Sequence, residues 1–296
     1  MSRARLNIVL VGVLAGLGAV VWFTREKPEV LPPLTTLTAD TLKQIVIEHP
    51  GAPLLRLEKQ DEQWQIVAPV KAPTDPLEVA GLISLTTSNV ERSLPLAEVS
   101  LAELGLEPPG YTVTLNDQLL AFGANEPIQA RRYIRTGDHV ALVSDPPSAA
   151  LDADYSDLVA KPLLPEGAKI VRIEVPGLTV SRNAEGTWAA DTQPDASAEK
   201  LQAFVDNWRK ARSMWNAAMP ADGASGGQAI RIVLEDGEIQ LRLAATEPQL
   251  QIDRPEYGVR YAVSKAEEAG LLTLASAVMP ASPDEAIQNA IAPASE

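Results

Sequence analysis

The 296-residue chain contains no cysteine and only two histidines. Without cysteine there are no disulfides, thiolate zinc sites, iron–sulfur clusters, cysteine nucleophiles or lipidation of an N-terminal cysteine. Two histidines are too few for a histidine-rich metal site. Basic residues are also scarce, with 25 Lys and Arg against 39 Asp and Glu and a formal net charge of −14. We therefore do not expect a nucleic-acid partner, because like charges repel.

Motifs of the common enzyme classes are missing as well. The sequence has no Walker loop, no Gly-x-Ser-x-Gly turn and no glycine-rich dinucleotide turn. His49 and His139 are expected at strand ends, away from any such turn. Asp152, Asp154 and Asp157 resemble the start of a calcium loop, but Leu163 stands where a bidentate Glu is needed. We therefore expect a non-enzymatic protein with no catalytic residue, no cofactor and no metal site.

One long apolar run, residues 6–23, stands out from the polar remainder. Its length is near the lower limit for a helix that crosses a bilayer, and arginine or lysine flanks it on both sides. We interpret residues 1–27 as a cytoplasmic tail and an uncleaved transmembrane anchor. The protein would then be a single-pass inner-membrane protein with its body in the periplasm. A cleaved signal peptide and a buried core helix are the alternatives.

Small residues recur within this run. Gly12 and Gly16 form a Gly-x-x-x-Gly pair, which would let a second membrane helix approach closely. We expect this face to pack on another span, although glycine is also common in spans that make no such contact.

The body of the chain is predicted to be an internal repeat that follows a linker at residues 28–41. The two units are residues 42–160 and 168–278. Each begins with an apolar strand, a Pro-Gly turn, a second strand and a tryptophan, Trp64 or Trp188. The tryptophans are interpreted as core residues rather than ligand platforms. A near-constant offset through several elements indicates duplication.

The second half of each unit is predicted to hold hairpins. The turns are Asn116-Asp117 and Asp236-Gly237, the latter a type I′ signal. Helices are expected to open near Asp75 and Asp195 and again at 147–159 and 264–278, and residues 279–296 are expected to be a disordered tail. The fold class is therefore α+β: an N-terminal transmembrane helix, then two duplicated units of antiparallel strands with one main helix each.

Arginine and tyrosine cluster twice in this acidic chain. The first group is Arg131, Tyr133 and Arg135, with Arg132 on the opposite strand face. The second group, interpreted as its echo, holds Arg254, Tyr257, Arg260 and Tyr261, so that Arg132-Tyr133-Ile134 would match Arg260-Tyr261-Ala262 and the strand after it would lack a partner. The groups are candidate partner-binding surfaces. The alternative is that the arginines pair with neighbouring carboxylates.

The segment LGLEPP, residues 104–109, follows the W-x-I-x-x-P at Trp64 and precedes Phe122-Gly123 and Tyr133. This combination resembles the bacterial domain-of-unknown-function family forty-three-forty over roughly residues 45–265. The resemblance implies a single N-terminal span and an extracytoplasmic body, in some members beside gliding-type ABC transporters. It implies no catalytic residue. The second unit lacks the LGLEPP motif.

We therefore expect a periplasmic accessory or interaction subunit of an inner-membrane or envelope complex, an ABC-type transporter being one such complex. Its partners would be the inner membrane and a protein such as a membrane permease. A periplasmic module that binds an envelope glycan or lipid is the alternative, and a hydrolase is a distant third.

Overall fold

The computed structural model describes residues 12–13, 15–17, 22, 31–144, 151–152, 154–220 and 226–274. Most of the expected anchor at 6–23 and all of the expected tail at 279–296 lie outside these ranges. Within them, no helix has both the length and the apolar character needed to cross a membrane. Gly12 and Gly16 are helical, with no neighbouring heavy atom near the position of an added Cβ.

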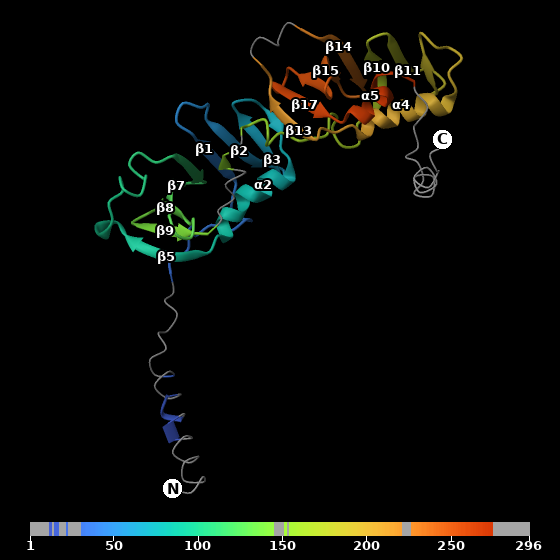
Figure 1. Cartoon of the computed structure of the whole chain (residues 1–296). Coiled ribbons are helices and arrows are strands. Elements are labelled where there is room, and N and C mark those ends of the chain that lie inside the picture. The colour runs from blue at the N-terminus through green and yellow to red at the C-terminus, as the bar shows by residue number, and fades with distance from the viewer. Residues whose placement is uncertain are drawn as a thin grey trace, which may run out of the picture.

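The described body is built on two antiparallel sheets with a few helices, an α+β arrangement (Figure 1). The first sheet has the strand order β4-β3-β2-β1-β6-β7-β8-β9-β5. Its strands are β1 (Gln44–Glu48), β2 (Leu55–Gln60), β3 (Gln63–Ala68), β4 (Ala72–Pro73), β5 (Val90–Pro95), β6 (Tyr111–Leu115), β7 (Gln118–Asn125), β8 (Arg132–Thr136) and β9 (His139–Val143).

The second sheet has the order β12-β11-β10-β14-β15-β16-β17-β13. Its strands are β10 (Ile170–Val175), β11 (Leu178–Arg182), β12 (Trp188–Ala190), β13 (Trp215–Ala218), β14 (Gln228–Leu234), β15 (Glu238–Ala245), β16 (Leu250–Arg254) and β17 (Val259–Val263). Leaving β4 aside, both sheets follow one strand order, which is the topology that an internal repeat predicts.

A strand that the sequence did not reveal completes each sheet. After its helix, the chain crosses to the far edge and adds β5 beside β9, or β13 beside β17. These edge strands are short or partly exposed, so their alternation of apolar and polar residues is weak.

The strand order corrects the predicted match between the two Arg/Tyr groups. Arg132-Tyr133-Ile134 lies in β8, whose counterpart is β16, whereas Arg260-Tyr261-Ala262 lies in β17, the counterpart of β9. The second unit is therefore not compressed there: the strand that begins at His139 has a partner in β17. The two motifs are similar in sequence, but their strands hold different positions in the two sheets.

Two further local expectations are wrong. The turn at Asp236-Gly237 is not type I′, because Val233 is paired with Glu238 and neither turn residue has a positive φ. Of the helix expected at 147–159, Leu151 is helical, but residues 154–159 form turns and an isolated bridge, and residues 147–150 and 153 lie outside the described ranges. In the other half, the expected helix at 264–278 is short, with η4 (Lys265–Glu267) followed by α5 (Glu268–Leu272).

One main helix follows the first strands of each unit, as predicted. Helix α2 (Pro76–Ile83) begins after Asp75, whose carboxylate accepts a hydrogen bond from the Leu77 amide. Helix α4 (Ala198–Lys210) begins after Ser197 rather than at Asp195, and its apolar side buries Phe204 and Trp208. Short 3₁₀ segments follow β5 and α2: η2 (Leu96–Glu98) and η1 (Ser84–Thr87).

The LGLEPP segment covers the outer face of the first sheet. Leu104 and Leu106 join a small apolar cluster with Ala121, Tyr133 and Val140. The fit is close at Gly123, where an added Cβ would lie 2.4 Å from the Leu104 carbonyl oxygen. The glycine of the Phe-Gly pair is therefore required by the backbone that crosses over it.

Residues 31–41, expected to be a linker, lie against this sheet. Leu34 is buried, its carbonyl accepts a hydrogen bond from Thr136, and Thr35 donates to the side chain of Gln118. This segment therefore belongs to the first unit. Trp64 and Trp188 are half-buried against the main core, on the corresponding strands β3 and β12.

Residues 158–163 connect the two units through backbone hydrogen bonds on both sides. Toward the first unit, the Asp75 amide donates to Leu158 and the Ala160 amide donates to Pro73. Toward the second, the Ser213 amide donates to Lys161 and the Leu163 amide donates to Ala211. One apolar core includes buried residues of both sheets. The connection is thus a paired element of the fold rather than a free linker.

Candidate functional site

The first predicted Arg/Tyr group is largely occupied by contacts within the chain. Arg131 forms a two-point ion pair with Glu126, with both N–O distances at 2.7 Å, and also contacts Glu91. This pairing raises the pKa of Arg131 and lowers that of Glu126. Tyr133 packs on the LGLEPP cluster. Arg131 and Tyr133 therefore have contacts that hold the β8 region together.

Arg135 is the accessible member of that group. It lines a shallow cavity of about 570 Å³ on the first unit, together with Thr36, Gln118 and Leu119. Leu119 is 55% exposed. Arg132, on the other strand face, donates to the carbonyl of Gly123.

The second predicted group is buried around the β16–β17 hairpin. The Arg254 guanidinium lies 3.8 Å over the ring of Tyr257 and donates to the Leu163 carbonyl and to Glu256. Arg260 makes a two-point ion pair with the fully buried Asp253, at 2.6 and 2.9 Å. Burial raises the pKa of Tyr257, and that of Tyr261 to about 12. These side chains hold the hairpin against the connection between the units.

The two groups therefore do not form one surface, because they lie in different sheets. The second group does reach the first unit, since Tyr257 and Glu256 line a cavity of about 380 Å³ with residues of β3 and β4. Tyr155 adds a bond across the same region by donating to the Gly258 carbonyl at 2.8 Å.

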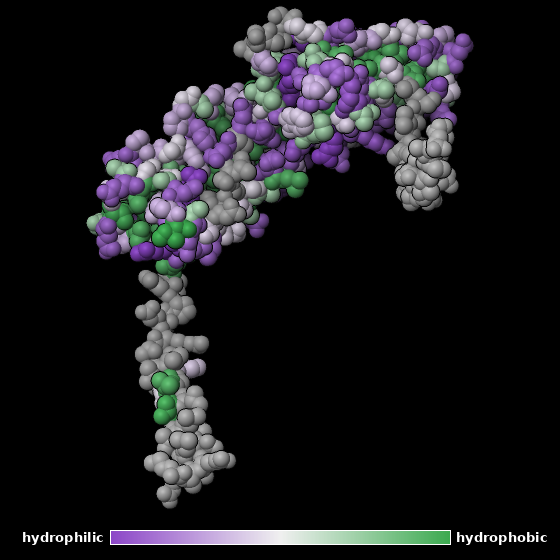
Figure 2. Space-filling model, viewed as in Figure 1, coloured by the Kyte–Doolittle hydropathy of each residue, from purple (hydrophilic) through white to green (hydrophobic). Residues whose placement is uncertain are grey.

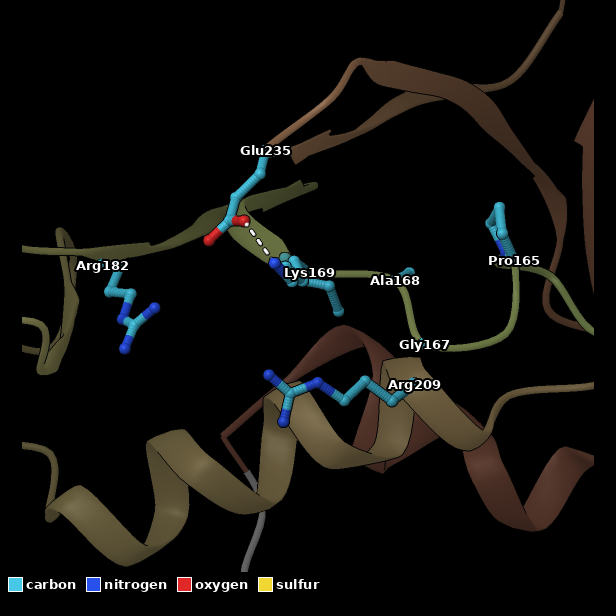
Figure 3. Close-up of a pocket in the computed structure, with 8 residues that line it drawn as sticks. Pro165, Gly167, Ala168, Lys169, Arg182, Arg209 and Glu235 are labelled. Carbon is cyan, nitrogen blue, oxygen red and sulfur yellow. Dashed lines mark ion pairs between the residues drawn. The ribbon is translucent and has the colours of Figure 1, made fainter.

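A different basic cluster, which sequence inspection missed, lies in the second unit (Figure 3). Lys169 precedes β10, Arg182 ends β11, and Arg209 lies in the last turn of α4. All three line a cavity of about 420 Å³, with the loop from Pro165 to Ala168 and with Glu235. In Figure 3 both guanidinium groups extend into the space between the strands and the helix. The only signal in the sequence is the two basic residues that end α4.

The acidic partners in this pocket are few. Lys169 pairs with Glu235 at 3.1 Å, and Arg209 pairs with Asp206 at 2.8 Å. Arg182 donates through Nε to the Gly186 carbonyl and, within the described part of the chain, has no carboxylate in ion-pair contact. Three cations thus face two carboxylates, and one positive charge remains in excess.

Exposed apolar side chains lie on both sides of the connection between the units. Met214 and Trp215, each 48% exposed, lie at the start of the edge strand β13, directly after Ser213. Leu77, 79% exposed, lies in the first turn of α2. Lys161 links the two places: its ammonium contacts Asp75 and Glu78, and its carbonyl accepts from Ser213. We call Leu77, Met214 and Trp215 the junction surface.

The face shown in Figure 2 is largely hydrophilic, with smaller apolar patches on both units. Edge strands such as β13 also carry backbone groups that can pair with another chain. Exposed apolar groups beside such an edge are typical of protein-binding sites.

The remaining candidate residues have structural contacts. His49 bonds to the Leu151 carbonyl at 2.8 Å and packs on Tyr111, and His139 contacts Asp138. Asp154 accepts from the Ser156 amide, as in a local turn. Within the ranges that the structure describes, no three His, Asp or Glu residues are grouped as metal ligands would be.

Comparison with known proteins agrees with the resemblance found in the sequence. The family described as "Domain of unknown function (DUF4340)" matches residues 64–219, which is more than half of the chain. The chain therefore belongs to this family. The matched range includes the LGLEPP cluster, the connection between the units and the residues of the pocket at Lys169 other than Glu235. Neither the curated proteins nor the solved structures contain a match to the chain.

Proposed function

We propose that this member of the DUF4340 family is a non-enzymatic accessory subunit of an inner-membrane complex, such as an ABC-type transporter. In this proposal the run at residues 6–23 anchors the protein in the inner membrane, and the two units lie in the periplasm. The two units are a duplicated pair, and their task is to bind a protein partner, for example a permease.

The observation that carries the proposal is the junction surface. Trp215 and Met214 are apolar side chains that are each 48% exposed. Burying the exposed part against a partner would be favourable by about 25 cal/mol per Å². Tryptophan is also among the residues that contribute most to protein–protein binding. The paired connection at residues 158–163 would keep the surface in a fixed geometry, so that little ordering is needed on binding.

The charge of the chain favours the same interpretation. The whole chain carries a formal net charge of −14. Its body should therefore be repelled by anionic lipid headgroups rather than lie on them. The body would then bind a protein partner through a local apolar surface, and it would not bind the lipid surface.

A photo-cross-linking amino acid placed at Trp215 tests the proposal in cells. We expect a covalent product with a membrane protein, and we expect the double variant Met214→Ser/Leu77→Ser to reduce its yield. The matched control carries the cross-linker at Ile128, which is 89% exposed but lies in the β7–β8 loop of the first unit. Equal products from both positions, or none from Trp215, would contradict the proposal.

The alternative, a module that binds an envelope ligand, is favoured by one observation, the cation-lined pocket at Lys169. That pocket is independent of the junction surface, since the two share no residue.

A further inference from the structure

We propose that the pocket formed by Lys169, Arg182 and Arg209 binds a small soluble molecule that carries a phosphate group. The proposal rests on the function argued above only for the membrane anchor at the N-terminal end, and it does not involve the junction surface. It rests on the geometry, charge and position of the pocket.

The three cations are exposed to solvent, and the fold brings them together around one cavity. The three cations come from separate elements, β11, α4 and the segment before β10, and they line one cavity of about 420 Å³. Figure 3 shows Arg182 and Arg209 reaching into this space from its two sides, with the Lys169 ammonium beside Glu235 on the strand side. The backbone supports Lys169, because its carbonyl accepts a hydrogen bond from the Glu235 amide at 3.0 Å.

The charge favours an anion. The molecule as a whole is strongly acidic, yet here three cations meet with carboxylates on only two of them. Arg182 uses its Nε for the Gly186 carbonyl and has no ion pair among the described residues, so its terminal amino groups remain to donate to a ligand. An anion in the cavity would neutralise the excess positive charge.

The arrangement of donors favours phosphate over carboxylate. A guanidinium group presents a planar fork that matches two oxygens of a phosphate. With one arginine on each side, a tetrahedral group can accept from both arginines and from the lysine at once. A planar carboxylate has only two oxygens and would leave part of this donor set unused.

The position favours a soluble ligand over a membrane lipid. The described body begins at Leu31, which packs in the first unit, whereas α4, β10 and β11 belong to the second unit at the other end of the molecule (Figure 1). A lipid headgroup near the N-terminal end would therefore be far from the pocket.

The experiment is calorimetric titration of the full chain in detergent with inorganic pyrophosphate, with citrate as the carboxylate probe. We expect pyrophosphate to bind and citrate to bind at least about tenfold more weakly. Arg182→Gln should weaken pyrophosphate binding by about tenfold or more, because the variant loses a charge-assisted hydrogen bond to the ligand. Glu235→Gln should tighten it, because a competing carboxylate is removed.

The matched control is Arg172→Gln. Arg172 is an exposed arginine of β10 that pairs with Glu174 and does not line the pocket. It should leave binding within about twofold of the unaltered chain. Thermal unfolding of each variant shows whether it is folded. Equal weakening by Arg172→Gln and Arg182→Gln, equal binding of citrate and pyrophosphate, or no heat at millimolar pyrophosphate would each overturn the proposal.

Discussion

The buried side-chain amide of Asn216 donates a hydrogen bond of 2.8 Å to the Val159 carbonyl. Asn216 also accepts from the Ser213 hydroxyl, so one side chain ties the edge strand β13 to the connection between the two units. A buried polar group of this kind is costly when its partners are lost.

Replacing this residue should therefore loosen the connection. We expect Asn216→Ala to lower the free energy of unfolding by about 1–3 kcal/mol, because the Val159 carbonyl and the Ser213 hydroxyl lose their partner. Urea unfolding measures the loss. Gln240→Ala, which removes an exposed amide from β15, is the matched control and should change stability by less than about 0.5 kcal/mol. Identical midpoints for the two variants would contradict this role for Asn216.

Gly123 should tolerate no side chain. A Cβ there would lie 2.4 Å from the Leu104 carbonyl oxygen, and a backbone atom cannot move away as a flexible side chain can. Gly123→Ala is expected to destabilise the chain by about 1–3 kcal/mol through overpacking. Gly237→Ala is the control, since no atom lies within 4 Å of its added Cβ and its φ is not positive. Thermal unfolding of both variants checks the difference, and an unchanged midpoint for Gly123→Ala would mean that the LGLEPP segment packs otherwise.

Among the residues that the structure describes, the buried Tyr111 hydroxyl has no hydrogen-bond partner. Tyr111→Phe should consequently leave stability unchanged or raise it, because the ring keeps its stacking on Phe122 while an unsatisfied group is removed. Tyr155→Phe provides the contrast: it removes the bond to the Gly258 carbonyl and should cost about 0.5–1.5 kcal/mol. If both substitutions lower stability equally in urea unfolding, the Tyr111 hydroxyl has a partner in solution.

Stability should fall at high pH. Burial raises the pKa of both Tyr111 and Tyr261 from 10.0 to about 12. An unfolded chain therefore releases these protons first, so the stabilisation is complete below pH 10 and is lost as the pH rises toward 12. Unfolding midpoints between pH 9 and 12 measure this slope, and Tyr111→Phe should reduce it. A slope that is the same with and without the Tyr111 hydroxyl would contradict the assignment.

The last prediction concerns the proposed membrane anchor. Gly12→Leu/Gly16→Leu should keep the protein in the membrane fraction but lower recovery of the partner cross-linked at Trp215. Leucine inserts well into lipid and prevents the close helix approach that small residues allow. The control, Val13→Leu/Leu17→Ile, changes neighbouring positions without adding bulk at the glycines. Full recovery with the glycine double variant would mean that the segment serves only as a tether.

Local sequence patterns determined the elements that depend on neighbouring residues. The hairpin at Asn116-Asp117 follows from a residue that adopts a positive φ, and α2 follows from the capping carboxylate of Asp75 and the proline after it. The alternation in residues 170–175 is enough to predict β10. The turn and the helix depend on contacts within a few residues, and the buried face of β10 is marked by its own apolar residues, so the sequence alone carries this information.

Tertiary structure alone decided which strands become neighbours. The alternation of a strand shows which face is buried but not which strand lies beside it. The sequence therefore could not predict that β5 and β13 are edge strands, or that β17, which carries Tyr261, corresponds to β9. The same reason hid the pocket. Lys169, Arg182 and Arg209 are well separated along the chain, and they meet only because the β10–β11 hairpin packs beside α4. Apolar residues recur with a period that indicates a helix or a strand, but no such period shows which charged residues will be neighbours in the fold.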